Sequence, residues 1–166
     1  MKKKLLSDHI KSNILRWWIA GAIYYFVGFG TQLGLVQNPI DFIFFLGVGM
    51  LLATKVIYNP IAYNMFSDPR LNKLYSKKHN ERTVLENVSL WLIEFIKCEF
   101  CVVLVYCTYQ IINNLIITLF SMKEDSVVLF GDPIIFGLFF LLFYNIINGL
   151  FDKIGVVKKG EKYEKQ

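Results

Sequence analysis

The chain has 166 residues, of which 55% are hydrophobic and 16% are aromatic. A soluble domain of this length does not carry so much apolar side chain, and charged residues are clustered between long uncharged runs, as in an integral membrane protein. The net charge of +5 does not indicate nucleic acid, because no aromatic platform or groove-reading motif accompanies the basic residues. We therefore expect a single-domain membrane protein with lipid as its main surroundings.

Residues 1–16 are basic, and apolar side chains recur every four residues at Leu6, Ile10 and Ile14. This spacing is compatible with a short amphipathic helix at the membrane surface, but a simple basic flank that sets topology is the favoured explanation of the charge. Residues 17–36 then form an uncharged run of 20 residues, long enough to cross a bilayer. Within that run, Gly30 and Gly34 form a Gly-x-x-x-Gly pattern, which favours close helix packing inside the chain or between copies.

A second span is predicted at residues 40–58, which makes residues 17–60 a first hairpin. The turn signal Gln37-Asn38-Pro39 precedes the span, and Asn59-Pro60 is expected to end it, because proline disfavours helix in the residue before it. Lys55 is the only charge inside the span. It either extends to the interface or faces a substrate path.

Residues 61–99 combine a basic loop with the start of a long helix. The capping box Thr83-Val84-Leu85-Glu86 predicts the helix start, and neither proline nor glycine follows before Gly131. A helix over 84–120 is about 55 Å long, whereas a bilayer core is about 30 Å thick. We expect its charged first part to stand in water and residues 100–120 to span. The predicted docking surface comprises Arg70, Lys73, Lys77, Lys78, Arg82, Glu94 and Lys97.

A fourth span is predicted at residues 133–151, opened by Pro133 at a favoured first-turn position. It completes a second hairpin over residues 100–151, and residues 152–166 form a basic tail. Five lysines and arginines fall in residues 1–16, five in the central loop and five in the tail, and only Lys123 falls on the opposite side. This asymmetry predicts a multi-pass protein of the cell membrane with both termini in the cytoplasm.

Polar residues recur on shared helix faces within the predicted spans. They either line a polar conduit through the membrane or form hydrogen bonds that hold the helices together. The candidates are Glu99, Tyr106, Gln110 and Asn113 on one face of the long helix, Asn145 and Asn148 in the fourth span, and Gln32 and Tyr25 in the first.

Cys98 and Cys101 lie three residues apart, on one face of the long helix. They form a redox pair, half of a metal site, or two small packing residues. Cys107 points in another direction, and both histidines lie outside the spans, so a four-ligand metal site is not expected. No nucleotide loop, nucleophile elbow or zinc-protease helix occurs in the sequence. We therefore expect neither enzyme activity nor a cofactor.

The stretch from Arg16 to Gly21, Arg-Trp-Trp-Ile-Ala-Gly, resembles the basic-aromatic-glycine opening of the GtrA-like proteins. Asn59 and Asn148, near the ends of two spans, resemble the asparagines of that family, although Pro60 and Gly149 follow them here in place of phenylalanine. The resemblance implies four spans and translocation of a lipid-linked sugar.

The sequence thus predicts an all-α membrane protein with four transmembrane helices in two hairpins. The leading hypothesis is a homo-oligomer, or an accessory subunit of a membrane transport or secretion complex, whose partners are membrane lipids and other membrane subunits. A GtrA-like or small-solute translocase is the first alternative. A membrane thiol oxidoreductase using Cys98 and Cys101 is the second.

Overall fold

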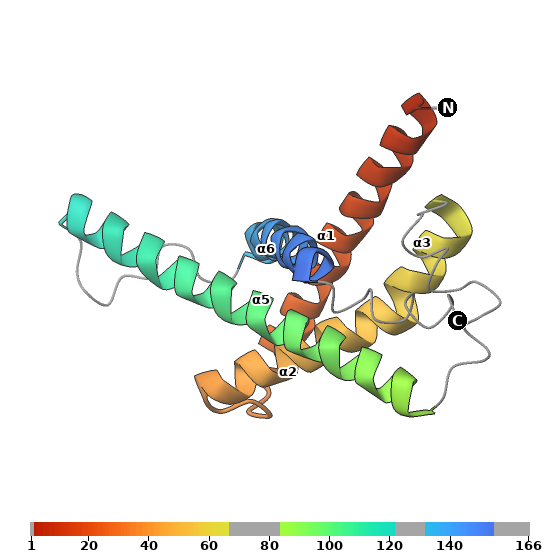
Figure 1. The fold of residues 1–166 in the computed structure, drawn as a ribbon. Helices are drawn as coiled ribbons and strands as arrows, with labels where there is room; N and C mark the ends of the chain where they lie inside the picture. Colours follow the sequence, from red (N-terminus) through yellow and green to blue (C-terminus); the bar gives the residue numbers. More distant parts are fainter. Residues whose placement is uncertain (1, 67–83, 122–131, 155–166) are drawn as a thin grey trace.

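The computed structural model describes residues 2–66, 84–121 and 132–154, and within these ranges the chain is entirely helical (Figure 1). The all-α prediction is confirmed for the described residues. The elements are α1 (Lys2–Gln32), α2 (Pro39–Leu52), the π-helix η1 (Ala53–Tyr58), α3 (Asn59–Phe66), α5 (Val84–Leu119) and α6 (Pro133–Ile154). The uninterrupted helix predicted over 84–120 is present as α5. The separate segments predicted over 1–16 and 17–36 are one helix, α1.

Two helices begin with an Asx cap followed directly by proline. The Asn38 side chain accepts the backbone N–H of Asp41 at 2.8 Å before α2, and Asp132 accepts that of Ile134 at 2.7 Å before α6. These caps satisfy backbone donors that the first turn leaves free, and proline has no N–H to satisfy there. Both predicted helix starts are thereby confirmed. Gly34, expected on a packing face, instead lies in the turn after α1 with a φ of 72°.

The expectation that Asn59-Pro60 ends the second helix is wrong. The chain remains helical from Pro39 to Phe66, and the segment before Pro60 is wound as a π-helix. The Asn59 N–H bonds to the carbonyl of Thr54, five residues earlier. A π-helical segment shifts the hydrogen-bond register by one residue, so the helix accommodates a proline without ending.

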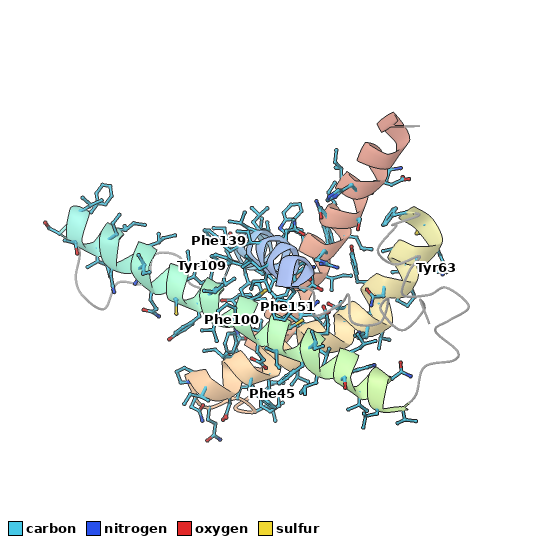
Figure 2. The ribbon with its side chains drawn as sticks, in the orientation of Figure 1. Phe45, Tyr63, Phe100, Tyr109, Phe139 and Phe151 are labelled. Atoms are coloured by element: carbon cyan, nitrogen blue, oxygen red, sulfur yellow. The ribbon has the colours of Figure 1, made fainter. Side chains whose placement is uncertain are left out.

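Contacts along the chain pair consecutive helices in antiparallel sense. Lys55 meets Trp91 while Phe44 meets Phe95, so α2–η1 and α5 run in opposite directions. The same holds for α5 and α6, where Tyr109 packs edge-on against Phe139 (Figure 2) and Lys97 contacts Asn148 further along. The helices nevertheless cross at wide angles, since α6 is seen almost end-on while α5 runs across the view (Figure 1).

A column of aromatic rings forms the centre of the helix crossing. Tyr24 of α1 stacks on Phe136 with ring centroids 4.5 Å apart, and Phe136, Phe140 and Tyr144 follow one another along α6. The four side chains are at most 6% exposed. Glycine makes this approach possible, because Gly137 faces Trp17, whose indole N–H donates to the carbonyl of Ile134 at 2.9 Å.

The outer surface of the helices is apolar. On α6 a row of aliphatic side chains four residues apart is half exposed, opposite the buried aromatic column: Ile134, Leu138, Leu142, Ile146 and Leu150. Monomeric soluble proteins rarely expose continuous apolar surface on this scale. By length and apolarity, two of the described segments are able to cross a membrane, Pro39–Phe66 and Pro133–Phe151.

Candidate functional site

A charged cluster joins the four long helical segments. Its members are Ser12 and Arg16 from α1, Tyr58 from η1, Glu94 and Lys97 from α5, and Tyr144 and Asn148 from α6. The guanidinium of Arg16 lies between two rings, 4.1 Å from the centroid of Tyr58 and 3.9 Å from that of Tyr144. Two cation–π contacts on one guanidinium fix its position between α1, η1 and α6.

Glu94 is the only acidic member of the charged cluster, and it has two partners. Lys97 lies 2.6 Å from one carboxylate oxygen, and the hydroxyl of Tyr144 donates to the other. Lys97 also donates to the side-chain oxygen of Asn148 at 3.0 Å. The Glu94 and Lys97 side chains are only 11% and 12% exposed. With Arg16, the cluster holds two cations and one anion.

Local helix geometry explains why these residues meet. Glu94 and Lys97 are three residues apart, so both lie on the α5 face that packs on α6. Tyr144 continues the aromatic column of α6, and Tyr58 ends the π-helical segment. The hydroxyl of Tyr58 makes a buried hydrogen bond with Ser12, one turn before Arg16 on α1. The charged cluster therefore lies at the Tyr144 end of the aromatic column.

The charged cluster corrects part of the predicted docking surface. Glu94 and Lys97 were expected in water on the first part of the long helix, but α1, η1 and α6 enclose them. A charge three residues from an opposite charge satisfies its partner locally, and this lets both side chains be buried. The other docking candidates, Arg70, Lys73, Lys77, Lys78 and Arg82, lie outside the described residues.

A second feature is a cavity of about 530 Å³ at the opposite end of α1. Tyr24, Tyr25 and Gln32 line it from α1, Asn38 from the turn before α2, and Tyr106 from α5. Its lining is aromatic, amide and hydroxyl in character and includes no charged side chain. This volume falls within the range of small-molecule sites.

The eight conduit candidates are divided among separate places. Tyr25, Gln32 and Tyr106 line the cavity, and Asn148 belongs to the charged cluster. Glu99 lies against Gly47 of α2, and Asn113 is half-buried. Gln110 and Asn145 are exposed. Within the described residues, three of the eight line one cavity, and the other five lie elsewhere.

Cys98 and Cys101 are both free thiols with no exposed surface. They belong to the main hydrophobic core with Val102 and Val105. A thiol that exchanges with a partner needs access to it. The packing role considered for these cysteines therefore agrees with where they lie, while Cys107 is exposed. Among the described residues, no group of three or more potential ligands is placed to hold a metal ion.

Reasoning from the sequence missed the roles of Arg16, Tyr58 and Tyr144. Arg16 was interpreted as part of a topogenic basic flank, and the tyrosines were not singled out. A usable signal was present, because these residues and the Glu94–Lys97 pair all lie near the same predicted membrane side of their helices. A charged residue at the end of one span, together with tyrosines at a similar depth in two other spans, indicates a cluster between helices.

No protein-family model, no curated protein and no solved structure matches this chain. The GtrA-like resemblance therefore stays a prediction made from a few residues. The arrangement itself offers a buried charged cluster, a neutral cavity and an apolar exterior.

Proposed function

We propose that this chain is a non-enzymatic, multi-pass membrane protein that works as an assembly of copies of itself, joined through the C-terminal half of α5. The membrane part of the proposal is supported by the apolar exterior and by the two segments able to cross a bilayer. Four spans with both termini in the cytoplasm are proposed from the distribution of lysines and arginines along the sequence. In Figure 1 the first residues of α1, the end of α3 and the start of α5 lie on one side.

The observation that carries the proposal is the exposed end of α5, which projects beyond the other helices (Figure 1). One side of this end, here named the α5 amide face, consists of Cys107, Gln110, Asn114 and Thr118, all exposed. Their spacing of 0, 3, 7 and 11 residues places them along one helix face. Neither amide side chain has a hydrogen-bond partner among the described residues, whereas Thr118 bonds back to the Asn114 carbonyl.

When an exposed amide side chain lies in a predicted span, lipid tails offer it no hydrogen bond, so it needs a hydrogen-bond partner from another helix. An amide group both donates and accepts hydrogen bonds, so a face carrying two of them complements a second copy of itself. Interhelical hydrogen bonds between Asn or Gln side chains join membrane helices. A twofold pairing of identical faces satisfies both amides at once. We therefore assign the α5 amide face to a second copy of this chain.

Cys107 lies on the α5 amide face and provides a direct test, because the other two thiols are buried. Mild oxidation of membranes that contain the protein is expected to link two chains through Cys107, giving a dimer on a non-reducing gel. A chain carrying Gln110→Leu and Asn114→Leu is expected to lose this crosslink, since leucine preserves helix and lipid compatibility but removes the amides.

The matched control is Asn145→Leu, which replaces an exposed amide on α6 and leaves the α5 amide face unchanged. It is expected to crosslink as efficiently as the natural chain. Mass measurement in a mild detergent gives a second readout. A lone 19.3 kDa chain that never crosslinks through Cys107 contradicts the proposal.

A second candidate function is that of a small-solute or lipid-linked-sugar translocase, and the cavity is the observation that favours it. Uptake into vesicles that contain the protein would test this function. Replacing Gln32 with alanine is expected to reduce transport while leaving Cys107 crosslinking unchanged, because Gln32 lines the cavity from α1 and is not part of the α5 amide face. If no transport is measured, or if Gln32→Ala does not change it, the translocase hypothesis is contradicted.

A further inference from the structure

Glu99 is a half-buried residue of α5 whose carboxyl group lies in the contact between α2 and α5. Its carboxyl group sits directly against Gly47, so closely that a side-chain carbon at this position would overlap it. Gly47 is buried and lies eight residues after Pro39, which places the contact about 12 Å along α2 from its first residue. Pro39–Phe66 is long and apolar enough to cross a membrane. The proposed membrane location, on which this inference rests, places the carboxyl among lipid tails.

The Oε1 atom of Glu99 is buried and has no hydrogen-bond partner among the described residues. Lys97, two residues away, is held by Glu94 and Asn148 in the charged cluster. Lys55 lies over the ring of Trp91, two turns before Glu99 on α5.

Among the described residues, no positively charged group on the elements around Glu99 is in contact with its carboxyl, because Lys97 and Lys55 contact other groups. The α2 stretch that faces it, from Phe42 to Leu52, contains no titratable residue. On its own helix the neighbouring titratable groups are Glu94 and Lys97, which pair with each other, and the thiols Cys98 and Cys101. From α6 the nearest titratable group is Tyr144, which donates to Glu94.

We propose that Glu99 is a proton-binding site, at which the carboxyl takes up a proton and is neutral while α2 and α5 are in contact. An ionised carboxylate in apolar surroundings without a partner is strongly disfavoured, whereas the protonated form removes the charge. Gly47 provides the space that the carboxyl occupies. A metal ion is a poorer occupant, because the contact provides one carboxylate and metal ions require several ligands.

A lipid-soluble carbodiimide, dicyclohexylcarbodiimide, tests this site because it reacts with protonated carboxyl groups in apolar surroundings. The carboxyl proton moves to a carbodiimide nitrogen, and the carboxylate oxygen forms a bond to the central carbon. The resulting O-acylisourea rearranges to a stable N-acylurea, so the product is a one-to-one adduct without a leaving group. Peptide mass spectrometry then locates the adduct in the full-length protein in lipid nanodiscs.

The expected result is labelling at Glu99 well above that of other carboxyl groups. The labelling rate should fall about tenfold for each pH unit above the midpoint of titration, as for a single proton. Glu99→Gln should abolish the adduct, and Asp41→Asn, at the start of α2, should leave it unchanged. Gly47→Ala should change the Glu99 rate by displacing the carboxyl.

Two results overturn the proposal: labelling at Glu99 no faster than at Asp41, or labelling at Glu99 that does not depend on pH. If Gly47→Ala fails to fold, the pH dependence of Glu99 labelling in the natural chain still tests the proposal. Infrared spectroscopy gives an independent readout, because a protonated carboxyl has its own carbonyl band, which Glu99→Gln should remove. Neither readout depends on self-association, so failure here is distinguishable from failure of the proposed assembly.

Discussion

The charged cluster makes a sharp prediction for Glu94→Ala. The change removes the only carboxylate of the cluster and leaves two cations, Arg16 and Lys97, enclosed by α1, η1, α5 and α6. Breaking a buried pair by removing one partner costs about 3–5 kcal/mol, because an uncompensated charge remains. An exposed pair is worth only about 0.2–1 kcal/mol. The Glu94 and Lys97 side chains are 11% and 12% exposed, so this pair is a buried one and the larger cost applies.

The assay is equilibrium unfolding of the purified protein in mixed micelles, with helix content as the signal. Glu94→Ala is expected to lower the free energy of unfolding by about 3 kcal/mol or more. The double variant Glu94→Met and Lys97→Met should recover part of that loss, since it removes the unpaired lysine and retains apolar volume, while Arg16 keeps only its contacts with the rings of Tyr58 and Tyr144. The matched surface control, Asn145→Ala, should stay within about 0.5 kcal/mol of the natural chain.

A loss below about 1 kcal/mol for Glu94→Ala would refute the buried cluster. It would return Glu94 and Lys97 to a hydrated docking surface, as the sequence alone suggested. A double variant as unstable as the single one would also contradict the reasoning, because the penalty would then not come from an unpaired lysine.

Three further predictions concern packing and access. Gly21→Ala should destabilise the fold by about 1–3 kcal/mol, since its new carbon would lie 2.7 Å from the Pro133 carbonyl oxygen, whereas Gly28→Ala has open space and should be neutral or stabilising; unfolding titrations that rank the two equally would argue against this helix contact. Tyr144→Phe keeps the ring beside Arg16 but removes the donor to the Glu94 carboxylate, so the free energy of unfolding should fall by about 1.5–3 kcal/mol; no measurable change would show that the hydroxyl is unpaired. In detergent-solubilised protein carrying Gln110→Leu and Asn114→Leu, which is expected to be monomeric, a maleimide should modify Cys107 first and the other two thiols only after unfolding, as followed by intact mass; equally fast modification of all three would contradict the core position of the pair.

Several features followed from short-range rules and could be predicted. The capping box before Val84, with no proline or glycine after it, predicts the single helix that the structure contains as α5. The Asx-Pro pairs at Pro39 and Pro133 predict two helix starts. These signals act over three or four residues, so the local sequence is enough to determine them.

The predicted helix end at Pro60 failed for a physical reason. Proline removes one N–H, and the usual consequence is a helix end or kink. Here the preceding turn is wound with one extra residue, and the Asn59 N–H bonds to Thr54 instead. The Tyr58 side chain at the end of that segment lies against Arg16 and Ser12, contacts that lie more than 40 positions away in the chain. Such contacts are not encoded in local propensity.

By itself the sequence determined where α2, α5 and α6 begin and that much of the helix surface is apolar, because capping and proline placement act locally. The tertiary structure decided which charges are buried and which polar faces lack a partner. Glu94 and Lys97 are spaced as any surface pair would be, and only the packing of α1, η1 and α6 around α5 encloses them. Burial depends on which helices cross at a residue, and the crossing is set by close contacts such as Gly137 on Trp17, which no single helix contains.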